Sequence, residues 1–362
     1  MYIKKQLEAG VQVSRLEIDI SDICNFRCPG CTFKYSQADA IMPFENIRNI
    51  ARELKRLQIT HVTLAGGGDP TQYRDNGFRL PDVTELFADY GIDIFLITNG
   101  YDLTVDDMKR ILPTVKSIRI SYYNFIAPGE PEQKNIVVGN NIKKLLQLRD
   151  QMSLDVPVII GNLVSYNKLS DYLFTLELAN TFGTIVTPRP LIHITKFADG
   201  TLDKEKTRAI LDRTLQNYEK IYGKINVTSP VAVREFLERV LAYNLPLEKK
   251  CTVTELGLVG KLRASGDLYR CGQLSAVPKE KRKHIPDEIL FSNVYADPRT
   301  KLLEHLAGVK ELTKYQSCPA CRETINNIRL NRFDALSDEI KAPILEVVME
   351  AYKDNQNLGG FW

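Results

Sequence analysis

The sequence predicts an α/β protein built on a mostly parallel sheet. From about residue 15 to residue 189, short apolar runs typical of buried strands alternate with helical patterns, and this alternation is the signature of βα units. A cysteine-rich loop directly follows the first of these runs, and a glycine-rich turn follows the second. Because α/β folds place their chemistry at the carboxyl ends of parallel strands, we expect both loops at the functional edge of the sheet.

The strands and helices of this region follow one another in a regular order. The first strand is expected at residues 15–20, where apolar and charged side chains alternate. Later strands are expected at residues 61–65, 92–98, 116–121, 156–164 and 184–188. Helices are expected between them, for example at Glu45–Leu57, where apolar residues keep helical spacing, and at Asn141–Arg149. Residues 1–200 are therefore predicted to form one domain of six βα units.

The pattern changes after the sixth strand. Helical patterns at Asp203–Tyr222 and Pro230–Tyr243 have no strands between them, so residues 201–250 are predicted to form a helical bridge. Residues 331–362 are expected to form a closing helix, Asp334–Tyr352, followed by a tail.

A second module is predicted between the bridge and the closing helix, at residues 251–330. Two strand-like runs, at 258–262 and 268–270, flank Gly266 as the two arms of a hairpin would. This module also holds the last four cysteines of the chain, which are Cys251, Cys271, Cys318 and Cys321.

The composition limits the class of function. The chain has 362 residues, 44% of them hydrophobic, which suffices for a substantial core and exceeds the usual size of one domain. Lys and Arg number 48 against 45 Asp and Glu, so nothing demands a nucleic-acid partner. No apolar run reaches membrane-spanning length, and no signal-peptide segment is present. We therefore expect a cytoplasmic protein. In that reducing compartment, seven cysteines favour metal or redox chemistry over disulfides. Residues 1–14 are too few for a separate peptide-recognition domain.

Three of the seven cysteines, Cys24, Cys28 and Cys31, lie in one loop with CxxxCxxC spacing. A 4Fe-4S cluster normally takes four thiolates, so this loop would leave one iron open to a ligand that is not protein. The alternative is a structural zinc site. Zinc would need a fourth ligand, for which Asp22 and His61 are the obvious candidates, and it would leave the neighbouring glycine-rich turn unexplained.

With these motifs the chain resembles the radical S-adenosylmethionine (SAM) superfamily, whose first-strand loop carries CxxxCxxC. The turn at residues 66–70, Gly-Gly-Gly-Asp-Pro, resembles the family's Gly-Gly-Glu-Pro turn, with Asp69 in place of glutamate. Residues 92–98 with the Asn-Gly that follows them, and residues 117–121, resemble the family's third and fourth strands. The resemblance implies an open (β/α)6 TIM-like partial barrel, a 4Fe-4S cluster on the three cysteines, and SAM chelating the open iron.

The resemblance also implies which residues contact SAM. Asp69 would pair with the SAM ammonium, and glycine backbone would approach the ligand closely. The implied contacts are Gly67, Gly68, Asp69, Asn99, Ser121 and Asn162. The family usually has an aromatic residue where this chain has Gly30, so Phe26 or Phe33 is expected to pack against the adenine.

Substrate-facing residues are expected near the ends of the fourth and sixth strands. The candidates are Tyr122, Arg189, His193 and Lys196. His193 is a candidate substrate base; the alternative is a hydrogen-bonded structural histidine. Tyr122 would either bind substrate or fill the mouth of the barrel.

The four later cysteines, with the hairpin and its glycine, resemble the auxiliary-cluster extensions called SPASM and twitch domains. The twitch form, with one cluster, fits four cysteines better. It implies a second 4Fe-4S cluster on Cys251, Cys271, Cys318 and Cys321. A structural zinc site on these four residues is the alternative, because cysteine spacing does not by itself select the metal.

The cysteine count then restricts the reaction. With all seven cysteines assigned, no thiol remains to donate a hydrogen atom, which disfavours a cysteine-dependent epimerase. We expect an oxidoreductase that oxidises a small molecule such as an aminocyclitol or sugar in natural-product biosynthesis, as the twitch-bearing aminocyclitol dehydrogenases do. It would need an external one-electron donor such as flavodoxin or ferredoxin. The alternatives are a ribosomal-peptide maturase that forms thioether or carbon-carbon links, and a non-catalytic zinc-binding protein.

Overall fold

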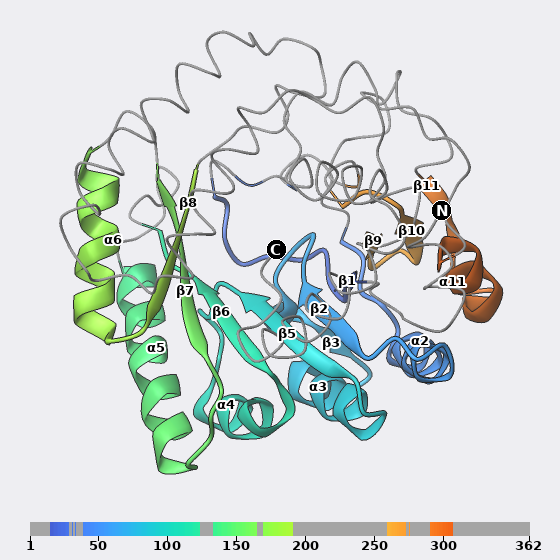
Figure 1. The fold of residues 1–362 in the computed structure, drawn as a ribbon, viewed down its shortest axis with the longest axis horizontal. Helices are drawn as coiled ribbons and strands as arrows, with labels where there is room; N and C mark the ends of the chain where they lie inside the picture. The colour runs from blue at the N-terminus through green and yellow to red at the C-terminus, as the bar shows by residue number, and fades with distance from the viewer. Residues whose placement is uncertain are drawn as a thin grey trace, which may run out of the picture.

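A computed structural model describes residues 15–28, 31, 33, 39–123, 133–164, 169–190, 259–272, 275 and 290–306. These residues form a curved sheet with helices along its outer face (Figure 1). The helices expected at Asp203–Tyr222, Pro230–Tyr243 and Asp334–Tyr352 lie outside the described residues. In the part that is described, no helix is long and apolar enough to cross a membrane.

Six parallel strands form the main part of the sheet. They are β1 (Arg15–Asp19), β2 (His61–Ala65), β5 (Asp93–Thr98), β6 (Ser117–Ser121), β7 (Val158–Val164) and β8 (Ile185–Pro190). Each pairs in parallel with the next, in the order β1-β2-β5-β6-β7-β8. The sequence-based assignment of these strands and of the parallel α/β class is confirmed. Parallel pairing places all their carboxyl ends at one edge.

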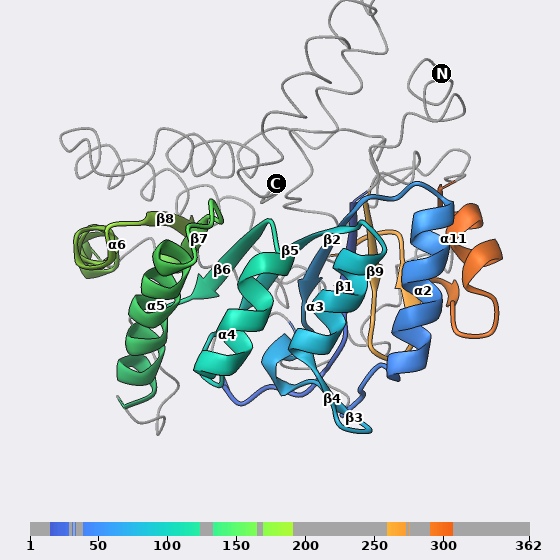
Figure 2. The same ribbon diagram turned by 90° about the horizontal axis from the view of Figure 1, so that it is seen from below.

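Helices follow the strands and cover one face of the sheet. They are α2 (Phe44–Arg56), α3 (Leu80–Asp89), α4 (Val105–Ile111), α5 (Gln133–Gln151) and α6 (Leu169–Phe182). Figure 2 shows them side by side along the outer face. The helix expected at Glu45–Leu57 is confirmed as α2, whereas the one expected at Asn141–Arg149 begins eight residues earlier, at Gln133.

Strand periodicity sorts side chains between two faces. Alternate residues of β1 and β2, such as Leu16, Ile18 and Leu64, are fully buried and join the apolar core under the helices. The residues between them face the concave side of the sheet. There β1 carries Glu17 and Asp19, and the other strands carry further polar residues. The concave face therefore mixes polar residues with apolar ones such as Phe95 and Ile159, whereas the helix-covered face is mostly apolar.

A hairpin from the last third of the chain joins this sheet. It consists of β9 (Val259–Leu262) and β10 (Asp267–Tyr269), and β11 (Leu290–Asn293) and α11 (Pro298–Leu306) follow. The predicted hairpin is confirmed, and Gly266 at its turn has φ +85°, a conformation that favours glycine. The sequence did not indicate that β9 pairs in parallel with β1. This pairing gives a nine-stranded sheet with the order β11-β10-β9-β1-β2-β5-β6-β7-β8, and β3 (Arg74–Asp75) and β4 (Phe78–Arg79) form a separate two-stranded sheet.

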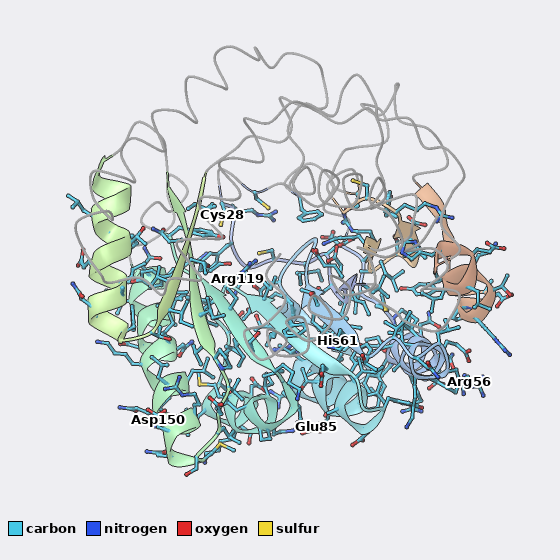
Figure 3. All side chains as sticks on the ribbon, viewed as in Figure 1. Cys28, Arg56, His61, Glu85, Arg119 and Asp150 are labelled. Carbon is cyan, nitrogen blue, oxygen red and sulfur yellow. The ribbon has the colours of Figure 1, made fainter. Side chains whose placement is uncertain are left out.

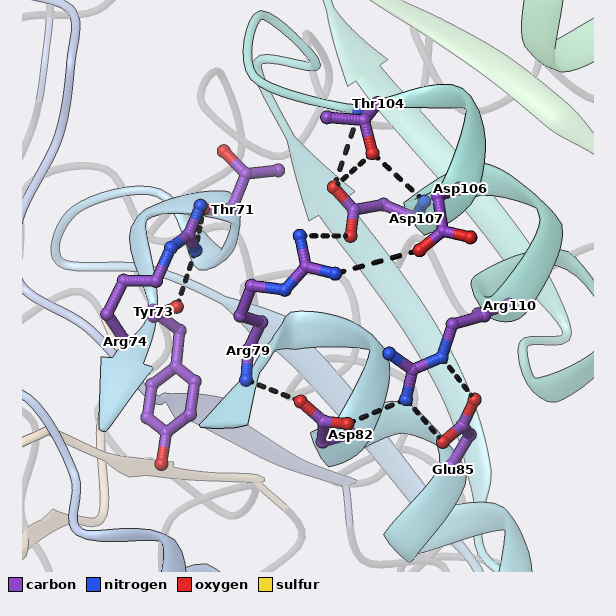
Figure 4. A network of polar contacts seen from close by, with 10 residues as sticks. All are labelled: Thr71, Tyr73, Arg74, Arg79, Asp82, Glu85, Thr104, Asp106, Asp107 and Arg110. Carbon is purple, nitrogen blue, oxygen red and sulfur yellow. Dashed lines mark hydrogen bonds and ion pairs between the residues drawn. The ribbon is translucent and has the colours of Figure 1, made fainter. Parts of the chain in front are cut away.

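Polar contacts tie α3 to α4 behind the sheet (Figure 4). The guanidinium of Arg110 donates to Asp82 at 2.6 Å and to both oxygens of Glu85 at 2.8 and 2.7 Å. Arg79 forms ion pairs with Asp106 and Asp107. Although burial alone would raise it, hydrogen bonds from Arg110 and from the Arg79 amide hold the pKa of Asp82 below its ordinary value.

We predict that Arg110→Gln lowers the free energy of unfolding by about 1 kcal/mol at pH 7, because it removes both bridges between α3 and α4. A carboxyl with a lowered pKa stabilises the fold above its unfolded-state pKa and loses this contribution as the pH falls. The difference from the wild type should therefore shrink below about pH 4. Urea unfolding at several pH values measures it. Arg52→Gln is the control and should change little, because the half-exposed Arg52 lies 3.8 Å from Glu53 and the closer Arg56 stays paired with that carboxylate.

Candidate functional site

The three cysteines of the CxxxCxxC loop lie close together after the carboxyl end of β1. The thiol of Cys24 accepts from the Phe26 amide, at 3.4 Å, and the Asn99 side chain lies 3.9 Å away. Burial, together with the nearby Asp69, Cys28 and Cys31, raises the pKa of Cys24 to about 12, although the hydrogen bond from the Phe26 amide lowers it. The three thiols are thus near enough to influence one another. As a free thiol Cys24 is a poor nucleophile, and a bound metal would be needed to hold it as a thiolate.

The glycine turn after β2 packs directly on the segment that leads into the cysteine loop. The Gly68 amide donates to the Ser21 carbonyl at 3.1 Å, and the Asp69 amide donates to the Ile23 carbonyl at 2.8 Å. A Cβ on Gly68 would overlap the Ile23 carbonyl, and a Cβ on Gly67 would overlap the Asp22 carboxylate. Glycine is therefore required at position 68, because the two backbones approach too closely for any side chain, whereas at position 67 side chains fill the space.

The Asp69 carboxylate is buried and joins this turn to the end of β5. One oxygen accepts from the Thr71 amide at 2.9 Å, the Thr71 hydroxyl at 2.6 Å and the Thr98 hydroxyl at 2.7 Å. The other accepts from the Asn99 amide at 2.6 Å. Burial raises the pKa of Asp69 against these hydrogen bonds. Both oxygens are thus engaged within the protein, and the predicted pairing with the SAM ammonium stays a prediction.

A second set of contacts holds the cysteine loop from the other side. The Asn99 side-chain amide donates to the side-chain oxygen of Asn25 at 2.7 Å, and the side-chain amide of Asn25 donates to the Asp102 carboxylate at 2.8 Å. The ammonium of Lys134, on α5, donates to the Asn25 carbonyl at 2.9 Å and lies 4.9 Å from the centroid of the Phe26 ring. Asn99 therefore lies at the expected edge, whereas the roles of Asn25, Asp102 and Lys134 were not predicted. The adenine contact of Phe26 stays a prediction.

Two adjacent tyrosines at the end of β6 face opposite sides of the sheet. The Tyr122 ring contacts Phe174 and Phe182 of α6, with centroids 5.9 and 6.1 Å apart, so it packs into the helix layer. This placement does not support Tyr122 as a substrate residue. The pKa of Tyr123 is raised, mainly by burial and also by the nearby Cys28 and Cys31, although a hydrogen bond with Ser121 opposes the shift. Tyr123 thus lies beside the cysteine loop, on the same face as Ser121.

Strand alternation was the signal that could have found Tyr123. If Ser121 faces the concave side, the next residue must face the helices and Tyr123 must face inward again. The same alternation applies to Asn162, whose side chain donates to Thr175 of α6 at 2.6 Å, on the helix side. The structure thus does not bring Asn162 to the site, and we leave it out of the candidate site. Its neighbour Gly161 faces inward, where the Arg119 side chain lies over it.

The residues present fit an iron-sulfur cluster better than a single zinc ion. Among the described residues, no group of three or more His, Cys, Asp and Glu side chains converges on one ion position. His61 lies at the start of β2, roughly 13 Å of strand from the edge that carries the cysteines, and Figure 3 shows it well away from Cys28. Asp22 pairs with Arg263 at 2.8 Å. Cluster ligands need not converge, because each thiolate of a cluster binds a different iron.

Several predicted site residues lie outside what the structure describes. They are His193, Lys196, Cys251, Cys318, Cys321 and the side chain of Arg189. Cys271 is described and lies, partly buried, just after β10. The second cluster and the catalytic roles of these residues stay predictions.

A parallel half-barrel with three clustered cysteines beside a glycine turn at its carboxyl edge defines an iron-sulfur protein of the open α/β-barrel class. Residues 18–125 match the family model described as Radical SAM superfamily. The chain therefore carries a radical SAM domain, and the family implies a 4Fe-4S cluster and SAM for it.

Comparisons with individual proteins agree with this assignment. The chain is 24% identical over 176 residues to the GTP 3′,8-cyclase of Tolumonas auensis and 24% identical over 225 residues to that of Aliarcobacter butzleri. These matches cover 45% and 59% of this chain, and 49% and 66% of those proteins. The chain thus spans half to two thirds of the length of these relatives.

Solved structures show the same fold. Streptococcus suis SuiB bound to the precursor peptide SuiA matches with a TM-score of 0.53 at 14% identity, over 88% of this chain and 72% of SuiB. The structure of anSMEcpe with bound AdoMet and the Kp18Cys peptide matches with a TM-score of 0.51 at 15% identity, over 80% of each chain. At these identities the likeness concerns the fold alone.

We predict that Asp69→Asn destabilises the protein by about 1 to 3 kcal/mol, because the amide places a donor against the donors that now surround the carboxylate. Thermal and urea unfolding measure this loss. Thr71→Val, which removes a single neutral hydroxyl donor to Asp69, is the matched variant and should cost less. An Asp69→Asn protein as stable as the wild type would show that the carboxylate does not hold the turn in this way.

Proposed function

We propose that this chain is a radical SAM oxidoreductase that removes a hydrogen atom from a substrate held over the concave face of the sheet. The observation that carries the proposal is the packing of the glycine turn against the three-cysteine loop, at the carboxyl edge of a parallel half-barrel. When bound, the cluster and SAM would supply a 5′-deoxyadenosyl radical.

The residues of the chain hold and orient these groups. Cys24, Cys28 and Cys31 would ligate the cluster, and the backbone of Gly67 and Gly68 would lie against SAM. The buried hydrogen bonds around Asp69 keep the turn in a fixed position relative to the cysteine loop. A rigid arrangement of this kind lets an enzyme aim a reactive group at one position of its substrate and exclude water.

The concave face favours a polar substrate. Arg119 of β6 is only 7% exposed, and its stem lies in the space that Gly161 leaves open. Ser121 and Tyr123 continue the same face, and Tyr123 lies near Cys28. A hydroxyl-rich or anionic small molecule, such as an aminocyclitol or sugar, would find hydrogen-bond partners here.

Oxidation requires that the substrate radical lose a proton and one further electron. In this proposal Cys251, Cys271, Cys318 and Cys321 hold a second 4Fe-4S cluster, whose use is electron transfer. An external donor such as flavodoxin or ferredoxin would supply the electron that initiates SAM cleavage.

Modification of a ribosomally made peptide is the second candidate. SuiB and anSMEcpe, which share the fold, were each solved with a bound peptide. Deoxyadenosine formation by the reconstituted enzyme should be measured with aminocyclitols and sugars, with peptides, and with GTP, since the sequence relatives are named GTP 3′,8-cyclase. Stimulation by a peptide alone would favour the second candidate over the first.

We predict about eight irons per chain after anaerobic reconstitution and about four in the Cys24, Cys28, Cys31→Ala triple variant, which should no longer cleave SAM. Iron, zinc and sulfide analysis measures both numbers. About four irons with one zinc in the intact chain would keep the radical chemistry but remove the electron-transfer role of the second site. Zinc without iron would contradict the proposed function.

The two tyrosines provide a matched pair. We predict that Tyr123→Phe lowers kcat about tenfold or more, because its hydroxyl lies among the groups that face the cysteine loop. Tyr122→Phe should leave kcat unchanged, because that ring packs against α6. Both effects are measured as steady-state rates with whichever substrate stimulates deoxyadenosine formation. A loss of kcat in Tyr122→Phe but not in Tyr123→Phe would show that the concave face is not the substrate face.

A further inference from the structure

Two buried cations of the C-terminal hairpin face the acidic concave side of β1. Lys261 is 1% exposed and Arg263 is 5% exposed. The Lys261 ammonium lies 2.8 Å from the Asp19 carboxylate and also pairs with Glu17, opposite it in the parallel register. The Arg263 guanidinium lies 3.2 Å from the other Asp19 oxygen. Burial raises the pKa of Asp19, and the two cations oppose this shift.

Arg263 also reaches beyond β1 to both loops of the SAM site. One terminal nitrogen lies 2.8 Å from Asp22, two residues before Cys24, and the guanidinium carbon lies 5.0 Å from the centroid of the Phe33 ring, two residues after Cys31. That same nitrogen occupies the space into which a Cβ on Gly67 would project. One guanidinium therefore touches the entry of the cysteine loop, the segment beyond it, and the glycine turn.

The chemistry of this contact is specific to arginine. A planar guanidinium presents several donors in a fixed fork and stacks on aromatic rings, so it can bridge two carboxylates and cover Phe33 at once. A lysine ammonium carries the same charge but lacks the fork. Removing one partner of a buried ion pair leaves the other charge without compensation, which is costly in the low-dielectric interior.

We propose that Arg263 is a positioning residue of the SAM site, which fixes the glycine turn against the cysteine loop through Asp22 and Gly67. The hairpin of β9 and β10 is then a structural part of that site. The inference rests on the proposed function, since it assumes that the pocket between the turn and the loop receives SAM.

The test compares Arg263→Gln, Arg263→Lys, Asp22→Asn and the Arg263→Gln/Asp22→Asn double variant. SAM affinity of the reconstituted proteins is measured by calorimetry, and hydrogen exchange of residues 66–70 is measured in the metal-free chains. We expect Arg263→Gln to weaken SAM binding about tenfold or more and to speed exchange at the Gly68 and Asp69 amides, with iron content kept. Arg263→Lys should fall between it and the wild type.

The double variant shows whether the two side chains act together. If Arg263 acts through Asp22, adding Asp22→Asn to Arg263→Gln should cost less affinity than it does in the wild type. Arg299→Gln, the same exchange at an exposed position of α11, is the control and should change neither affinity nor exchange. If Arg263→Gln does not fold, Asp22→Asn and Arg263→Lys carry the test alone.

The outcomes separate this inference from the proposed function. Wild-type affinity and wild-type exchange in Arg263→Gln would overturn the positioning role while leaving SAM cleavage by the intact enzyme untouched. A wild-type protein that binds four or more irons but no SAM would instead refute the proposed function.

Discussion

Two backbone hydrogen bonds, from Gly68 to Ser21 and from Asp69 to Ile23, are the constraint on which the site depends. They join the ends of two neighbouring parallel strands, and they form only where no side chain intervenes. The cysteine loop that follows Ile23 therefore starts from a fixed position. The hydrogen bonds of the Asp69 carboxylate and the side chain of Asn99 extend from this junction toward β5.

Charge is managed differently on the two sides of the junction. Toward β5, the buried Asp69 carboxylate is compensated by hydroxyl and amide donors alone. Toward β9, the carboxylates of Asp19 and Asp22 are compensated by full cations. The hydrogen bonds around Asp69 come from residues near it in the chain or on the neighbouring strand. The ion pairs of Asp19 and Asp22 instead make the site depend on Lys261 and Arg263, which are far away in the sequence.

The parallel sheet and the hairpin could be predicted because each rests on local periodicity and turn chemistry, whereas the pairing of β9 with β1 could not. The three cysteines and the glycine turn could be predicted because their spacing has a chemical reason. Tyr122 was a candidate because it follows the fourth strand, but strand alternation turns it toward α6 and turns Tyr123 toward the concave face. Arg263 was missed because its role arises from pairing between β1 and β9, although alternating acids in one strand and alternating bases in the other were a usable signal.

The placement of β9 beside β1 has a consequence for biosynthesis. Lys261 and Glu17 are 244 residues apart in sequence, so at ordinary translation rates roughly 10 to 50 s separate the emergence of the two strands. During that interval β1 has an unpaired edge and its acidic side chains lack their cations. Pairing of such distant segments is slow and leaves the early part of a chain exposed to aggregation. The contacts of Lys261 and Arg263 with Asp19 and Asp22 therefore form only after the hairpin has been synthesised.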